Sequence, residues 1–270
     1  MNTQLLVRDL IQKNNAKILL IVLDGLGGLP INGRTELDAA RKPNLDALAR
    51  DSACGLHIPV APGITPGSGP GHLSLFGYDP VEWQIGRGVL EALGLGIELR
   101  KTDIAIRVNY ATIEGGFIKD RRAGRPPTEE SRKITDRLQE KIRNVDDVEV
   151  IFAPGMEHRF AVVLRFPEPL PRGSAAIKDT DPQKDGKKPL PVIPVIPQAE
   201  RVARIVEKLI IAITEVLNKE PVANFALFRG FAQVPDIPHF SDAYGLNPIC
   251  IAVYPMYRGL ARLIGMDAPP

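Results

Sequence analysis

Continuous apolar runs occur near both ends of the chain. Residues 17–23 (KILLIVL) are apolar at every position after the lysine, which is typical of a strand buried on both faces of a parallel sheet. Residues 54–60 predict another short strand, and residues 249–254 predict a second strand of the buried kind. Asn44 precedes apolar residues at helical spacing, so a helix is expected to continue to Arg50. These segments predict an α/β arrangement of strands and helices.

The middle of the chain has a different period. Residues 104–110 alternate between large apolar side chains and smaller or polar ones, as a half-buried antiparallel strand does. Residues 114–116 (EGG) predict a hairpin turn directly after it. A stretch rich in proline and lysine at 167–197 predicts a long surface loop. The other predicted elements are helices at 3–13, around 134–142, at 200–217 and at 256–264, and strands at 148–152 and 160–166.

This order of patterns predicts one domain inserted into another. Residues 1–97 and 243–270 are expected to form an α/β domain with a mostly parallel sheet and helices on both faces. Residues 98–242 are expected to form the inserted α+β domain, with an antiparallel sheet. A chain of 270 residues is long enough for two such domains.

Composition excludes several classes of partner. The formal net charge of +2 gives no global field for a nucleic acid or a membrane surface. No apolar stretch approaches the ~20 residues that span a bilayer, and charged residues interrupt the N-terminal apolar positions, so no signal peptide is expected. Cys54 and Cys250 lie in apolar runs and are expected to be buried, free thiols, with a single disulfide as the less favoured alternative. A cytoplasmic protein is therefore predicted.

Asp24 directly follows the first predicted strand. Ligands of open α/β sheets bind at the carboxyl edge, where such a residue lies, and a carboxylate there suits a hard divalent cation. The alternative is a turn residue, because Asp-Gly is a common turn dipeptide. Position alone favours neither interpretation.

Ser68 lies in a loop of small residues, Gly67–His72 (GSGPGH). Small neighbours allow a phosphate or a metal to approach the backbone closely. A serine hydroxyl needs a base or a metal to become a nucleophile. A plain loop rich in glycine and proline is the alternative, and without further information it is the better one.

Basic residues cluster in the segment predicted to be inserted. Asp120, Arg121 and Arg125 belong to DRRAGR after the hairpin, His158-Arg159 precedes a predicted strand, and Arg229 follows an apolar run. Arginine binds carboxylate and phosphate oxygens in a bidentate manner, so a small acidic substrate would fit. For any single arginine, a solvated basic surface remains the alternative.

Taken together, these motifs resemble the archaeal-type bisphosphoglycerate-independent phosphoglycerate mutases of the alkaline-phosphatase superfamily. The resemblance follows family order over nearly the whole chain. Its stretches are KILLIVLDGLGG (17–28), KPNLDALA (42–49), PVAPGITPGSGPGHLSLFGYDP (59–80), GRGVLEALG (86–94), DRRAGR (120–125), EHRF (157–160), DTDP (179–182), LFRGF (227–231) and AVYPMYRGLARLIGM (252–266).

The resemblance implies a partial alkaline-phosphatase-like fold and a role for each candidate residue. Asp24 would be a metal ligand, and Ser68 would be both a metal ligand and the nucleophile. The substrate would be phosphoglycerate, with 3-phosphoglycerate and 2-phosphoglycerate interconverted through a phosphoserine intermediate and two divalent ions, Mn²⁺ or Mg²⁺. The residues implied to grip phosphate and carboxylate are Asp120, Arg121, Arg125, His158, Arg159 and Arg229.

One departure from the family pattern concerns the metal ligands. Family members continue past the position of Met266, and a later Asp/His set completes their metal sites. This chain has four histidines and none in that layout. Activity is therefore expected to need a C-terminal part, supplied by a longer product or by a complementing chain. A homo-oligomer is the other possible assembly. A metal-dependent phosphomonoesterase and a non-catalytic phosphoglycerate-binding remnant are the alternative functions.

Overall fold

The computed structural model describes residues 3–269 and divides them into two compact units. Residues up to Ile11, together with those from Pro59 onward, form the larger unit. Residues Gln12–Ile58 form the smaller one. The predicted division at 97/98 and 242/243 remains a prediction.

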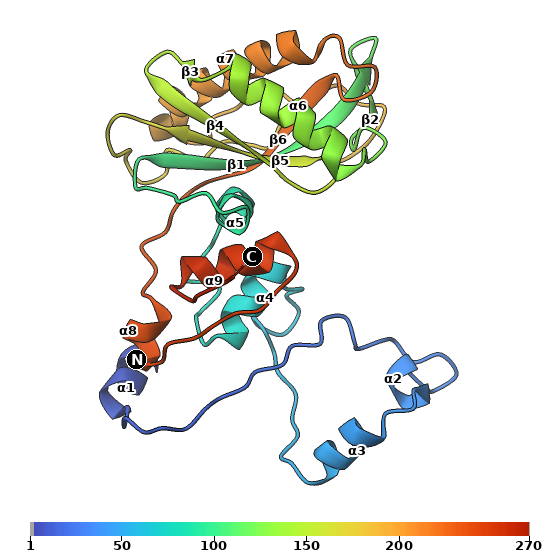
Figure 1. Cartoon of the computed structure of the whole chain (residues 1–270), viewed down its shortest axis with the longest axis vertical. Coiled ribbons are helices and arrows are strands. Elements are labelled where there is room, and N and C mark those ends of the chain that lie inside the picture. Colours follow the sequence, from blue (N-terminus) through green and yellow to red (C-terminus); the bar gives the residue numbers. More distant parts are fainter. Residues whose placement is uncertain (1–2, 270) are drawn as a thin grey trace. The chain divides into compact units, whose positions relative to one another are not determined.

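The larger unit contains an antiparallel sheet (Figure 1). Its strands follow the order β2-β1-β5-β4-β3, and β6 pairs with β1 as well. β1 is the longest strand and forms the centre of the sheet, because β2, β5 and β6 all pair with it. The strands are β1 Asp103–Glu114, β2 Phe117–Asp120, β3 Asn144–Val145, β4 Val148–Pro154, β5 Arg159–Arg165 and β6 Phe225–Gln233.

Two helices, α6 (Thr128–Lys141) and α7 (Glu200–Leu217), cover one face of this sheet (Figure 1). The large apolar residues of β1, such as Ile106 and Val108, are fully buried in the same core as the apolar stripes of these helices. The alternation and the helical stripes therefore predicted this face correctly, because both periods come from burial on one side.

The opposite face is covered at one end by α5 (Arg87–Gly94), which lies between the sheet and α9 (Pro255–Leu263) (Figure 1). The backbones approach closely, since a Cβ atom at Gly88 would collide with the carbonyl oxygen of Ala105. We refer to this face, which also carries Arg107, as the α5 face.

Shorter elements complete the two units. In the larger unit these are α1 Thr3–Leu10, α4 Ser68–Leu75, the 3₁₀ turn η1 Pro197–Ala199 and α8 Phe240–Tyr244. In the smaller unit they are α2 Glu36–Ala39 and α3 Pro43–Arg50. A capping box between Thr35 and Asp38 starts α2. α3 begins at Pro43 after the cap residue Lys42, so the predicted cap Asn44 lies inside the helix.

Three of the predicted strands are absent from the part of the chain that the structure describes. Residues 17–23, 54–60 and 249–254 form no named strand, and the only regular pairing among them is an isolated parallel bridge from Ile249 to Asp267. The apolar side chains of residues 18–23 are 42% to 84% exposed. An apolar run becomes a strand only when a neighbouring strand accepts its hydrogen bonds, and the sequence pattern says nothing about that neighbour.

The predicted fold class is nevertheless confirmed as a mixed α/β chain with an antiparallel sheet. Both cysteines are free, as predicted, but Cys54 is exposed and Cys250 is only half-buried, so their predicted burial is wrong. Among the described residues, no helix has the length and apolar character needed to cross a membrane.

Candidate functional site

Ser68 is the first residue of α4, and its side chain is exposed. The sequence favoured a loop here, but the structure starts a helix at the serine itself. The helix is held by buried Leu73 and by His72, whose ring stacks on Tyr257 of the α9 region with centroids 4.3 Å apart. Within the part of the chain that the structure describes, no side chain caps the helix start at Gly67. An anion attached to Ser68 would therefore meet the positive end of a helix and free backbone N–H groups.

Asp24 lies in a turn of the smaller unit, directly after residues 17–23. Ser68 belongs to the larger unit, so the two candidate metal ligands come from different units. Within the described residues, no group of three or more His, Cys, Asp or Glu side chains could hold a metal ion. The donors present do not by themselves make a site for one or two divalent cations, which usually take six or more oxygen ligands each.

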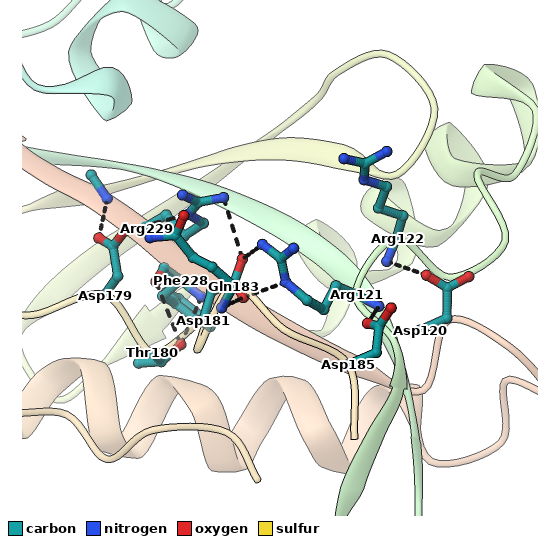
Figure 2. A network of polar contacts seen from close by, with 11 residues as sticks. Asp120, Arg121, Arg122, Asp179, Thr180, Asp181, Gln183, Asp185, Phe228 and Arg229 are labelled. Carbon is teal, nitrogen blue, oxygen red and sulfur yellow. Dashed lines mark hydrogen bonds and ion pairs between the residues drawn. The ribbon is translucent and has the colours of Figure 1, made fainter. Parts of the chain in front are cut away.

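Arg121 and Arg229 meet at a buried carboxylate (Figure 2). Asp181, whose side chain is fully buried, accepts two hydrogen bonds of 2.7 Å from Arg121. Arg229 contacts the same carboxylate at 3.3 Å, and its Nε donates to Asp179 at 3.3 Å. Burial raises the pKa of Asp181, but the hydrogen bonds from Arg121 and from the backbone of Gln183 outweigh it and leave this pKa lowered.

The segment that carries Asp179 and Asp181 runs beside β6. The backbone N–H of Thr180 donates to the carbonyl of Phe228 at 2.9 Å, and the N–H of Phe228 donates to the Thr180 hydroxyl at 2.8 Å. Asp179 also accepts from the N–H of Gly230 at 2.8 Å. These bonds fix the two aspartates in front of the arginines.

Asp120 acts within its own loop. It accepts a hydrogen bond of 2.8 Å from the backbone N–H of Arg122 (Figure 2). It also accepts one of 2.6 Å from the N–H of Gly124. Ala123, Gly124 and Arg125 all have positive φ, so the loop is tightly wound and Asp120 holds its shape. Arg125 is exposed beyond this turn.

His158 and Arg159 stand at the start of β5. His158 is only 3% exposed, and its Nδ1 has no hydrogen-bond partner among residues 3–269. Arg159 donates to the hydroxyl of Tyr254 at 3.1 Å. Burial, with the charges of Arg159, Arg122 and Arg125, lowers the pKa of His158 from its ordinary 6.5 to about 4, although Glu157 opposes the shift. The histidine is therefore neutral at physiological pH.

This buried neutral histidine makes stability depend on pH. Because its pKa is about 4 in the folded state and 6.5 when exposed, its contribution is complete above pH 6.5 and is lost as pH falls toward 4. We expect the free energy of unfolding to drop by about 2 kcal/mol more between pH 7 and pH 5 in the wild type than in His158→Gln. Urea unfolding at the two pH values measures this difference. Equal pH dependence in both proteins would contradict it.

The structure therefore joins some of the predicted residues and not others. Asp181 links Arg121 with Arg229, and His158 lies within the electrostatic influence of Arg125 and Arg159. Sequence reasoning missed Asp179 and Asp181 as partners of the arginines. DTDP signalled a motif at these positions, but its pairing with DRRAGR depends on contacts about 60 positions apart in sequence. Arg107 and Asn109 were treated as the polar positions of an ordinary strand.

The fold and the site define the class of protein. It is a mixed α/β protein with an arginine-rich sheet face and a serine at the start of a helix. The family profile of 2,3-bisphosphoglycerate-independent phosphoglycerate mutase matches residues 49–223, well over half of the chain. A probable 2,3-bisphosphoglycerate-independent phosphoglycerate mutase from Aquifex aeolicus (strain VF5) is 61% identical over 266 residues, which is 97% of this chain and 65% of that protein. A protein of the same name from Thermus thermophilus is 53% identical over 267 residues and is covered to 65%.

Two solved structures agree. The cofactor-independent phosphoglycerate mutase from Thermoplasma acidophilum matches 92% of this chain and 67% of its own, with a TM-score of 0.64 and 34% identity. The PH0037 protein from Pyrococcus horikoshii matches 91% of this chain and 59% of its own, with a TM-score of 0.73 and 30% identity. The chain belongs to the 2,3-bisphosphoglycerate-independent phosphoglycerate mutase family, and it spans about 65% of the length of the curated relatives it matches.

Proposed function

We propose that this chain contributes the nucleophile and the substrate-binding face of a phosphoglycerate mutase, an isomerase that interconverts 3-phosphoglycerate and 2-phosphoglycerate. The observation that carries the proposal is the pairing of two features in one family member. Ser68 stands exposed at the start of α4, and a sheet face in the same unit carries Arg107, Arg159 and Arg229. Arg121 is linked to Arg229 through Asp181.

In the proposed reaction, Ser68 carries the phosphoryl group and the arginines hold the substrate. The oxygen–phosphorus bond of 3-phosphoglycerate breaks as the Ser68 hydroxyl oxygen bonds to phosphorus, and the serine proton passes to the departing oxygen. Glycerate then reorients, and its other hydroxyl oxygen takes the phosphoryl group back in the reverse exchange. The N-terminus of α4 stabilises the negative charge of the phosphoserine. Arginine residues of the sheet face keep the acid groups bound while glycerate turns.

Asp24 and Ser68 are our candidates for metal ligands. Two divalent ions, Mn²⁺ or Mg²⁺, would offset the charge on the transferring phosphoryl group. Since the described residues hold no group of three or more His, Cys, Asp or Glu ligands, we assign the remaining ligands to the part of the relatives that this chain does not cover. The 270 residues alone are then expected to give no turnover.

Phosphorus NMR of 3-phosphoglycerate tests this function. The chain is assayed with Mn²⁺, once alone and once joined to the part of the Aquifex aeolicus relative that it does not match. We expect 2-phosphoglycerate from the joined protein only. Robust turnover by the unjoined chain would overturn the need for the additional part. Released inorganic phosphate in place of 2-phosphoglycerate would show a phosphomonoesterase instead.

A further inference from the structure

The register of the sheet places four polar residues together on the α5 face. Arg107 of β1 lies opposite Arg229 of β6, and Asn109 of β1 lies opposite Arg159 of β5. Because residues 107 and 109 point to the same side of β1, the four positions are neighbours. Directly opposed residues have Cβ atoms about 5 Å apart, so these side chains can bind one small molecule.

Their hydrogen bonding is unequal. Arg229 is engaged by Asp179 and Asp181. In contrast, the Nε atoms of Arg107 and Arg159 and the Oδ1 atom of Asn109 are buried without a hydrogen-bond partner among the described residues. Arg159 does donate through its Nη1 to the Tyr254 hydroxyl, at 3.1 Å. Asn109 is only 4% exposed, and the Arg107 side chain is 15% exposed. Buried polar groups are nearly always satisfied in proteins, so unpaired donors and an unpaired acceptor side by side indicate a ligand.

A buried carboxylate lies close to Arg107. Glu91 of α5, with a side chain 6% exposed, lies 4.0 Å from Arg107 Nε. This contact is too long for a hydrogen bond, so the carboxylate acts on the arginines through its charge. Arg87 of the same helix and Tyr254 also lie within electrostatic reach of Arg107. Burial raises the pKa of Glu91, while Arg107 and Arg159 oppose that shift.

We infer that Arg107, Arg159 and Asn109 form the primary binding position for an oxyanion with a neighbouring hydroxyl group, and that Glu91 is the internal counter-ion of this position. The arginines donate to the oxyanion, and the Asn109 oxygen accepts from the hydroxyl. Glu91 offsets the two positive charges while the position is empty and opposes the anion once it is bound. The inference rests on the proposed function in identifying the ligand as the acid end of phosphoglycerate.

Calorimetric titration of the 270-residue chain tests the arginines. Inorganic phosphate and 3-phosphoglycerate are titrated separately at low salt with EDTA present. We expect Arg107→Gln and Arg159→Gln each to weaken both ligands at least about tenfold, because each removes a charge-assisted hydrogen-bond donor. Arg107→Lys keeps the charge without the planar fork and should weaken binding less. The matched control is Arg204→Gln, an exposed arginine on α7, which should change affinity less than about twofold.

The sign of the effect at Glu91 separates a counter-ion from a structural support. Glu91→Gln keeps the shape of the side chain and removes its charge, so phosphate and 3-phosphoglycerate should bind about three- to tenfold more tightly. A purely structural role would give weaker binding instead, and that result would overturn the role of Glu91. For Asn109 the comparison is 3-phosphoglycerate against 2-phosphoglycolate, which lacks the hydroxyl. The wild type should prefer 3-phosphoglycerate, and Asn109→Ala should lose that preference.

The binding test needs neither a metal nor Ser68, so its failure differs from failure of the proposed function. Unchanged affinity in folded Arg107→Gln and Arg159→Gln would overturn the binding position even if the joined protein isomerises phosphoglycerate. Conversely, both variants could lose affinity as expected while the joined protein fails to isomerise phosphoglycerate. That result would support the binding position and overturn the mutase proposal. If a glutamine variant fails to fold, Arg107→Lys takes its place. Unchanged affinity of Arg107→Lys for phosphate and 3-phosphoglycerate would again count against the inference.

Discussion

Ser68→Ala is expected to abolish phosphoglycerate isomerisation by the joined protein, with kcat falling by about four to six orders of magnitude, because removing the nucleophile of a covalent mechanism leaves only binding and charge stabilisation. Stability should change little, since the Ser68 side chain is exposed at the helix start. Phosphorus NMR measures the rate, and mass spectrometry of the peptide containing Ser68 measures trapped phosphate.

Ser74→Ala is the control for this experiment, because it removes a hydroxyl from the same helix, outside the proposed chemistry. It should retain most of the wild-type rate. If Ser68→Ala keeps more than about a tenth of that rate, Ser68 is not the nucleophile. Phosphate trapped on a different residue would lead to the same conclusion.

Asp181→Asn is expected to give the largest loss of stability, about 3–5 kcal/mol in the free energy of unfolding. The fully buried carboxylate pairs with Arg121 and Arg229, and the amide leaves both guanidinium groups without their counter-charge. Urea unfolding followed by circular dichroism measures the loss.

Asp179→Asn is the matched control, because its side chain is 35% exposed and contacts Arg229 alone among the arginines of the network. We expect it to cost about 1 kcal/mol or less. Equal losses for the two variants would show that Asp181 is not the anchor of the network. In the double variant Asp181→Asn with Arg121→Gln, part of the loss should be recovered, because one unpaired charge is gone.

Periodic segments were predictable from the sequence, and segments that depend on a distant partner were not. Helix α7 occupies residues 200–217 as predicted, since its apolar stripe is long and packs on one face. The run at 17–23 has an equally clear composition, but its state depends on a pairing that composition does not encode. Ser68 shows the same limit on a smaller scale, because a stretch rich in glycine and proline gave no signal for the start of α4.

In the candidate site, too, residue types were predictable from the sequence but their contacts were not. Motifs indicated that Arg121 and Arg229 matter, and their residue type suggested an acidic ligand. Their actual contacts are with Asp181 and Asp179, because the chain folds back along β6. Arg107 lies in a strand whose alternation was correctly predicted. That its Nε has no hydrogen-bond partner among the described residues follows only from the packing of α5 against the sheet. Sequence gives residue types and periods, whereas contacts decide which charges remain available.

The segment that carries Asp179, Thr180 and Asp181 has a consequence for the behaviour of the protein in concentrated solution. A strand that pairs on one side only presents unpaired backbone groups on the other, and such an edge invites association with other chains. Thr180 occupies part of the free side of β6 by bonding with Phe228 in both directions. The prolines that follow it lack the N–H groups needed to extend a sheet outward. The same residues that set the arginines in place thus shield this edge against aggregation.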